Sequence, residues 1–184
     1  MESQVGVGTT FSIYLPAASR PHVPTASTGD TPAQGSGHVL LMDDNEAIRA
    51  LAGDLLEELG YEVTAAEDGL KAIERYTECL AYGRPFDAVI LDLTVPGGMG
   101  GKDTILQLRK LDSGVKAIVS SGYSNDPVMA NYRDYGFQGV LVKPYGIAAI
   151  SSLLHRLLDR GNGKMPTALG RSHKNQDGPP LAEY

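Results

Sequence analysis

Acidic, hydroxyl and amine side chains each come directly after a short apolar run of this sequence. Asp43 and Asp44 follow one run, and Asp92 follows a second. Ser121 and Lys143 end two more. Short runs rich in branched residues are typical of strands buried on both faces of a parallel sheet. Because open α/β sheets bind their ligands at the carboxyl ends of the strands, we expect these five side chains to form one site.

The residue types at these strand ends predict a site that accepts a phosphoryl group. Three carboxylates packed together repel one another unless a cation joins them. Oxygen ligands suit a hard divalent ion, and Mg²⁺ is the ion that we expect. Lys143 and Ser121 add a positive charge and a hydroxyl donor beside the acids. The metal and the ammonium group could neutralise the phosphoryl oxygens while a carboxylate attacks.

Alternating strands and helices must position these side chains. The five predicted strands cover residues 39–42, 61–66, 88–91, 115–119 and 139–142. Four of the helices that follow them have apolar faces at helical spacing, made of Ile48, Leu51, Leu55 and Leu59; Leu70, Ile73, Tyr76 and Leu80; Ile105, Leu108 and Leu111; and Ile147, Ile150, Leu154 and Leu157. Asp126 and Pro127 open a weaker fourth helix. The predicted fold is α/β, a flavodoxin-like, doubly wound, five-stranded parallel sheet in the order 2-1-3-4-5 with five helices.

The segments on either side of residues 38–160 have a different composition. Residues 17–37 are rich in Ala, Ser, Thr, Pro and Gly, which predicts a flexible linker. Residues 161–184 are polar and predict a disordered tail. Polar and apolar residues alternate from Thr10 to Leu15, which predicts a half-buried strand cut from a larger sheet.

The overall composition excludes several classes of protein. The chain has 184 residues, of which 42% are hydrophobic, so it can form one ordinary domain with a core. A net charge of -6 and the lack of a basic stripe argue against a nucleic-acid partner. No stretch is long enough to span a membrane or resembles a signal peptide. The single cysteine, Cys79, excludes an internal disulfide, and we expect a cytoplasmic location without membrane contact.

Residues 38–160 resemble the receiver domains of two-component signalling, in the acid pair, the strand-end aspartate, the Ser-Gly pair and the Lys-Pro pair. The resemblance implies that Asp92 is the phosphoacceptor and takes its phosphoryl group from a phosphohistidine. It implies that Asp43 and Asp44 hold the Mg²⁺ together with Asp92 and the backbone carbonyl of Thr94. Such a domain is a signalling phosphoacceptor and not an enzyme.

The same resemblance implies roles for the two remaining strand-end residues. Ser121 would donate a hydrogen bond to a phosphoryl oxygen, and Lys143 would pair with the phosphoryl group. Ser120 would point to the opposite face of its strand. Val140 departs from the family, because the position three residues before the lysine is usually aromatic and takes part in the conformational switch.

A second, shorter resemblance lies at the N-terminus. Gly6-Val7-Gly8-Thr9-Thr10-Phe11, followed by Ile13-Tyr14-Leu15-Pro16, is similar to the last glycine box and final strand of a histidine-kinase ATPase domain. Residues 1–16 would then be a remnant of that domain, and the receiver would belong to a hybrid sensor histidine kinase. Its expected partner is a histidine kinase or a histidine phosphotransfer protein, with a weak homodimer through the fourth helix and fifth strand.

Three other functions are compatible with parts of this pattern. Asp92-Leu93-Thr94-Val95 partly resembles the opening motif of haloacid-dehalogenase-type phosphatases, although that motif needs a second acid where Thr94 stands. An interaction module with the receiver fold but no phosphorylation is a second alternative. A free-standing regulator is the third.

Overall fold

The computed structural model describes residues 2–12, 14, 32–123 and 126–159. Its chain divides into two units, Met1–Thr31 and Pro32–Tyr184. The predicted tail at 161–184 and residues 17–31 of the predicted linker lie outside the described residues. No helix among the described residues is long and apolar enough to cross a membrane.

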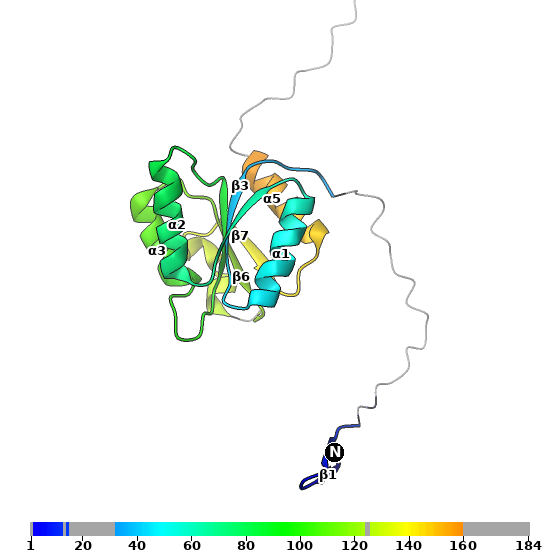
Figure 1. Ribbon diagram of the computed structural model, residues 1–184. Helices are drawn as coiled ribbons and strands as arrows, with labels where there is room; N and C mark the ends of the chain where they lie inside the picture. The colour runs from blue at the N-terminus through cyan, green and yellow to red at the C-terminus, as the bar shows by residue number, and fades with distance from the viewer. Residues whose placement is uncertain (1, 13, 15–31, 124–125, 160–184) are drawn as a thin grey trace, which may run out of the picture. The chain divides into compact units, whose positions relative to one another are not determined.

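The larger unit is a parallel sheet with helices on both faces (Figure 1). Its strands are β3 (His38–Met42), β4 (Glu62–Ala66), β5 (Ala88–Asp92), β6 (Ala117–Ser121) and β7 (Gly139–Val142). They are hydrogen-bonded in the order β4-β3-β5-β6-β7, and all pairs are parallel. This order is the predicted 2-1-3-4-5, so the predicted fold class is confirmed.

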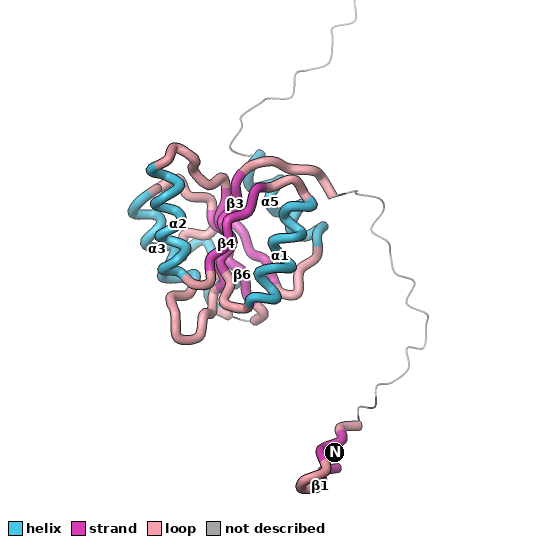
Figure 2. The backbone as a smooth tube through the Cα atoms, in the orientation of Figure 1, coloured by secondary structure: helices cyan, strands magenta, loops and turns pink. Residues whose placement is uncertain are grey.

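The helices cover the two faces of the sheet in pairs. The long helices are α1 (Glu46–Glu58), α2 (Gly69–Ala81), α3 (Gly101–Leu111) and α5 (Ile147–Asp159). Helices α2 and α3 lie on one side of the strands, and α1 and α5 lie on the other (Figure 2). Each face has its own cluster of buried side chains, because alternate residues of every strand point to opposite faces.

The fourth helical segment is shorter than a full helix. Helix α4 covers only Pro127–Ala130, and a 3-10 helix follows at Tyr132–Tyr135. The Asp126 side chain accepts a hydrogen bond from the Val128 N–H and caps α4, with Pro127 in its first turn as predicted.

The predicted helical faces are only partly correct. Four leucines that were expected to face the core are exposed: Leu51, Leu70, Leu80 and Leu111. Small side chains take their places, such as Ala52 in α1 and Ala72 in α2, which are fully buried. Helix-to-sheet packing brings backbones close together, so it selects the small residues beside each predicted apolar stripe.

The smaller unit contains a short hairpin and not the strand predicted at Thr10–Leu15. Strand β1 (Glu2–Gln4) pairs antiparallel with β2 (Gly8–Thr10), and all six residues are exposed. Phe11, Ser12 and Tyr14 are not in a strand, whereas Ile13 and Leu15 lie outside the described residues. Alternation predicts a strand only where a second layer can cover its apolar side, and this hairpin buries neither side.

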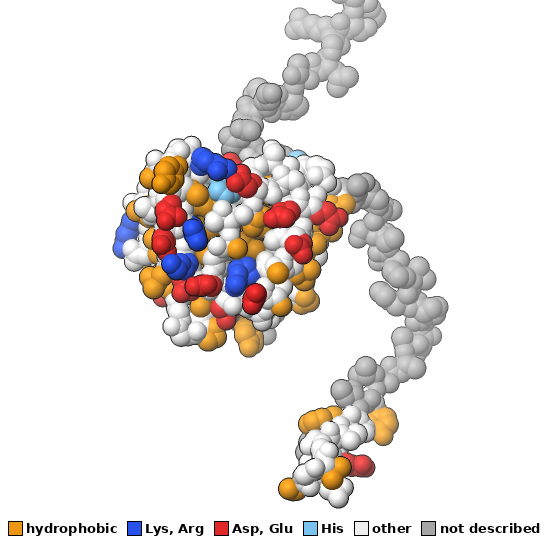
Figure 3. All heavy atoms as spheres, in the orientation of Figure 1, with side chains coloured by type: hydrophobic (Ala, Val, Ile, Leu, Met, Phe, Trp, Pro, Cys, Tyr) orange, Lys and Arg blue, Asp and Glu red, His pale blue; other side chains and the backbone are white. Residues whose placement is uncertain are grey.

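Acidic and basic side chains lie interspersed on the face of the larger unit drawn in Figure 3. Several of them form exposed ion pairs, such as Lys71 with Glu74 and Arg84 with Glu62. Exposed pairs of this kind contribute little to stability, about 0–1 kcal/mol each. The buried charges at the carboxyl end of the sheet have a different setting.

Candidate phosphoryl-acceptor site

The carboxyl ends of four strands meet at one edge of the sheet. In the register of the ladders, Met42 lies opposite Leu91, Asp92 opposite Ser120, and Ser121 opposite Val142. The residue after each of β3 and β7 therefore lies level with the last residues of β5 and β6. One pocket brings the predicted residues together, and it is lined by Asp43, Asp44, Asp92, Thr94, Ser121 and Lys143 among others.

Three carboxylates converge in this pocket. Asp43 and Asp92 are buried, with 1% and 6% of their surface exposed, whereas Asp44 is exposed. One carboxylate oxygen from each lies within 4.8 Å of the other two. An all-oxygen donor set with one side open to water fits a hard divalent cation such as Mg²⁺, which keeps several of its waters. The residues present therefore fit this ion.

Lys143 links the two buried acids. Its Nζ lies 2.5 Å from Asp43 Oδ2 and 2.9 Å from Asp92 Oδ2. Burial lowers the pKa of Lys143, but hydrogen bonds and charge interactions with the two carboxylates outweigh burial, so the pKa rises above its ordinary value. The lysine is therefore a fixed positive charge that can serve either acid or a group between them.

The carboxyl of Asp92 has an unusual environment for a group that must be ionised. Burial raises the pKa of Asp92, and the nearby negative charge of Asp43 raises it further. Lys143 and the backbone N–H of Thr94 act in the opposite direction but do not cancel the rise. The ionised carboxylate of Asp92 therefore lowers the free energy of unfolding. Ionisable groups kept in such unfavourable surroundings are more often reactive than structural.

The hydroxyl of Ser121 is available to a group in the pocket. Its Oγ accepts a hydrogen bond from the Tyr123 N–H at 3.1 Å, which leaves the O–H free to donate. Ser120 has the same strand parity as Ile118, which belongs to the cluster beneath α1 and α5. Ser121 has the parity of Val119, in the cluster of the other face, as the period of two predicts.

The first turn of α1 supports the acid pair through Asn45, a cap that its residue type predicts, and through Arg49, a contact that sequence reasoning missed. Asn45 caps α1 by accepting hydrogen bonds from the Ala47 and Ile48 N–H groups, and its own N–H donates to Asp43 Oδ1 at 3.0 Å. Arg49 Nη1 donates to the backbone carbonyl of Asp43 at 2.6 Å. The cap was predictable from its residue type, whereas the contact of Arg49 depends on how the chain turns after β3.

Thr94 and Val140 lie near the site in different ways. Thr94 is exposed on the wall of the pocket, at the start of the loop between β5 and α3. Val140 is half-buried and packs against the cluster beneath α2 and α3. The peptide bond between Lys143 and Pro144 is cis. Tyr145 follows this bond and packs against the cluster on the other face.

Comparison with known proteins finds receiver domains and response regulators among the relatives of this chain. A family model described as the response regulator receiver domain matches residues 39–155. The chemotaxis protein CheY of Thermotoga maritima is 31% identical over 120 residues, which cover 65% of this chain and 95% of CheY. The response regulator TrrA of Thermotoga maritima, solved in complex with Mg²⁺-BeF, superposes with a TM-score of 0.56 at 27% identity, covering 66% of this chain and 98% of TrrA.

One relative is much longer than this chain. The sensor kinase CckA of Brucella abortus is 31% identical over 172 residues, which cover 86% of this chain but 17% of CckA. The chain thus corresponds to a small part of that kinase. The similarity also covers more of this chain than the match to the family model does.

Proposed function

The chain belongs to the response regulator receiver domain family, and from this premise we propose that Asp92 accepts a phosphoryl group from a phosphohistidine. The members of this family are signalling phosphoacceptor domains and not enzymes, so the phosphatase alternative is wrong. The observation that carries the proposal for Asp92 is the double contact of Lys143 with Asp43 and Asp92. This contact supports the proposal, because an ammonium group beside Asp92 could pair with an oxygen of a phosphoryl group on that residue.

In the proposed reaction, a carboxylate oxygen of Asp92 attacks the phosphorus of the donor. The new P–O bond forms as the P–N bond to the imidazole breaks, and the imidazole leaves with the electron pair of that bond. Lys143 exchanges its contact with the Asp92 carboxylate for one with a phosphoryl oxygen. Ser121 donates its free O–H to another phosphoryl oxygen.

A divalent metal completes the proposed site. Asp43, Asp44, Asp92 and the backbone carbonyl of Thr94 would hold Mg²⁺. When bound, this ion would neutralise negative charge on the carboxylates and the transferred group. The three-carboxylate cluster of this pocket supports the assignment.

We further propose that the chain is the receiver end of a hybrid sensor histidine kinase. Residues 1–16 would be a remnant of the kinase ATPase domain, 17–37 a linker, 38–160 the receiver and 161–184 a tail. The similarity to CckA over 86% of this chain supports this layout. The partner would be the cytoplasmic kinase core or a histidine phosphotransfer protein, with weak self-association through α4 and the sheet-edge strand β7.

Intact-mass measurement after incubation with acetyl phosphate and Mg²⁺ tests the proposal. We expect one phosphoryl adduct on the wild type, and none on Asp92→Asn or without Mg²⁺. Asp87→Asn is the matched control, because Asp87 precedes the same strand and lies outside the pocket at its carboxyl end. It should keep the adduct. A wild type without an adduct would contradict the proposal and favour an interaction module that is not phosphorylated.

A further inference from the structure

The loop between β5 and α3, residues 93–100, carries Thr94, whose backbone carbonyl is one of the proposed metal ligands. Thr94 and Pro96 of this loop line the pocket of the phosphoryl-acceptor site. A backbone ligand has no rotamer of its own, so its position is the position of the loop. Gly97, with a φ of +74°, and Gly98 are exposed, and glycine restricts the backbone little. The loop therefore needs support from neighbouring elements to hold Thr94 in one place.

Helix α2 supports the far end of this loop through its first residue, Gly69, which is buried. The Gly69 N–H donates a hydrogen bond of 2.9 Å to the Met99 carbonyl. A Cβ on Gly69 would lie 2.8 Å from Met99 O and 2.7 Å from Met99 Cγ, and it would collide with Thr104 Oγ1. Such short separations leave no room for a methyl group. The loop can therefore approach α2 this closely only because residue 69 has no side chain.

Thr104 decides which of these neighbours would give way to a larger residue. It lies in α3 and is fully buried. Its Oγ1 donates a hydrogen bond of 2.8 Å to the Gly100 carbonyl and lies 3.9 Å from the sulfur of Met42, the last residue of β3. Because protein interiors are close-packed, a side chain held between α3 and β3 has little room to move. A side chain added at residue 69 would therefore displace the loop and not the core.

Gly100 connects the position of Met99 to that of Thr94. A Cβ on Gly100 would collide with the carbonyl oxygen of Leu93, and it would lie 3.8 Å from the backbone nitrogen of Val95. Leu93 and Val95 are the two chain neighbours of Thr94. The end of the loop thus packs against its beginning on both sides of the proposed ligand, so a displacement of Met99 would also displace Thr94.

We propose that Gly69 and Gly100 are positioning residues that hold the loop between β5 and α3, and with it the Thr94 carbonyl, in place for a divalent cation. This inference rests on the proposed function and deepens it. Both residues act by lacking a side chain, Gly69 from α2 and Gly100 from within the loop. Neither is among the residues that line the pocket, so a substitution at either acts on the metal through the backbone of the loop.

The test compares the Mg²⁺ affinity of the wild type with those of Gly69→Ala and Gly100→Ala. Because the chain has no Trp, binding is followed by amide NMR shifts. We expect each variant to bind Mg²⁺ about 10-fold more weakly, as for the loss of a group that supports a metal ligand. Adduct formation from acetyl phosphate should slow at low Mg²⁺ and recover most of its rate at saturating Mg²⁺, because the groups proposed to contact the phosphoryl group are unchanged.

A glycine at the other end of the sheet separates positioning from a general loss of stability. Gly37→Ala places a Cβ 2.5 Å from Asp87 Oδ2. It should lower the urea midpoint of unfolding, as Gly69→Ala does, but leave the Mg²⁺ affinity unchanged. Without metal, the amide shifts of residues 93–100 should change in Gly69→Ala and not in Gly37→Ala. Because Gly100→Ala leaves α2 unaltered, it keeps the inference testable if Gly69→Ala does not fold.

Two results would overturn the inference. One is an unchanged Mg²⁺ affinity in a folded variant of Gly69 or Gly100, and the other is an equal loss of affinity in Gly37→Ala. A wild type that binds no Mg²⁺ would instead overturn the proposed metal site, and the inference with it.

Discussion

Two aspartates at opposite ends of strand β5 use the same functional group in different ways. Asp87, just before the strand, is exposed, and its Oδ2 accepts a hydrogen bond of 2.7 Å from the His38 N–H. Asp92, the last residue of the strand, is buried beside Asp43 and Lys143. The first acid satisfies a backbone donor and stabilises the start of β3. The second is kept in a setting that penalises its charge, as expected for a reactive group.

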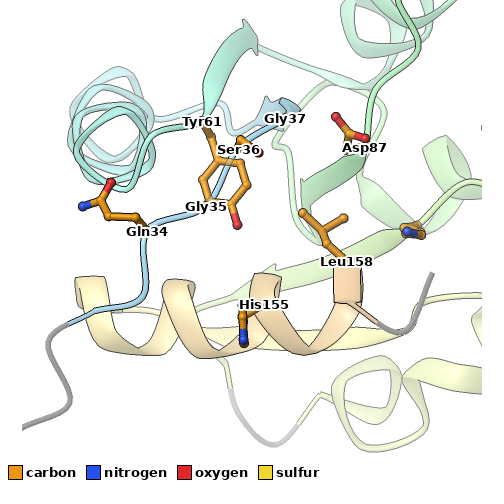
Figure 4. Close-up of a pocket in the computed structure, with 9 residues that line it drawn as sticks. Gln34, Gly35, Ser36, Gly37, Tyr61, Asp87, His155 and Leu158 are labelled. Atoms are coloured by element: carbon orange, nitrogen blue, oxygen red, sulfur yellow. The ribbon is translucent and has the colours of Figure 1, made fainter. Parts of the chain in front are cut away.

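The surroundings of the two acids also differ, because one end of the sheet is packed by backbone contacts and the other holds a charged pocket. At the amino end of the sheet, residues 32–37 lie against the rest of the larger unit through backbone hydrogen bonds, from Gly35 N–H to Leu59 O and from Glu62 N–H to Gly37 O. Figure 4 shows Tyr61 beside this segment and projecting toward α5. At the carboxyl end, the charged side chains of Asp43, Asp92 and Lys143 gather in a pocket. The contacts at the amino end of the strands therefore stabilise the fold, whereas the carboxyl end holds the groups that could react.

The largest effect should come from the lysine at the carboxyl end. We expect Lys143→Met to slow phosphorylation by acetyl phosphate by about 100-fold, the usual loss when one preorganised charge or donor is removed from a transferring group. The measurement is the rate of adduct formation by intact mass. Lys116→Met is the matched change at the amino end, where Lys116 lines the pocket of Figure 4. A similar loss in both variants would contradict the division of roles.

A glycine at the amino end should affect stability but not chemistry. Gly37 has a φ of +130°, and a Cβ there would lie 2.5 Å from Asp87 Oδ2. We expect Gly37→Ala to lower the free energy of unfolding by about 2–3 kcal/mol, because it adds both backbone strain and a clash. Urea denaturation measures this change, and the phosphorylation rate should stay within about 2-fold.

The same substitution in α1 provides the control. A Cβ on Gly53 would meet no atom within 4 Å, so Gly53→Ala should stabilise the chain by about 0.5–1 kcal/mol. Equal effects of the two alanine substitutions would show that residues 32–37 do not pack as described.

The smallest effects that we expect are changes in the free energy of unfolding when Asp92 or Asp87 is replaced, and they should have opposite signs. In metal-free buffer at neutral pH, we expect Asp92→Asn to raise the unfolding free energy by about 1 kcal/mol, because functional sites are often held at a cost in stability. Asp87→Ala should lower it by about 1 kcal/mol, since it removes the acceptor of the His38 N–H. Thermal unfolding should detect each change as a shift of roughly 2–4 °C.

The stability difference between Asp92→Asn and the wild type should also depend on pH. Because the pKa of Asp92 in the folded chain is raised, its ionisation destabilises the fold above that pKa. The penalty decreases as the pH falls and vanishes below the ordinary value of 3.8, where the carboxyl is neutral in both states. The advantage of Asp92→Asn over the wild type should therefore shrink on acidification, and an advantage that grows would contradict the assigned cause.

Local patterns were sufficient to predict the elements of the larger unit and their order. The apolar runs and helical periods depend on side-chain geometry within a few residues, and the alternation of strands and helices restricts the sheet to a few topologies. The strand-end acids, Ser121 and Lys143 could be placed at one edge for the same reason. Alternation alone also separated Ser121 from Ser120.

Packing between distant segments decided the rest. Leu51 and Leu70 are exposed because the close approach of helix to sheet favours the small residues beside them. The strand predicted at Thr10–Leu15 needed a partner layer that the hairpin does not provide. The double contact of Lys143 joins residues at the carboxyl ends of three strands. The sequence by itself determined which chemical groups stand at the strand ends, whereas only the tertiary structure decided which of them touch, because contact depends on distances between segments that no local pattern contains.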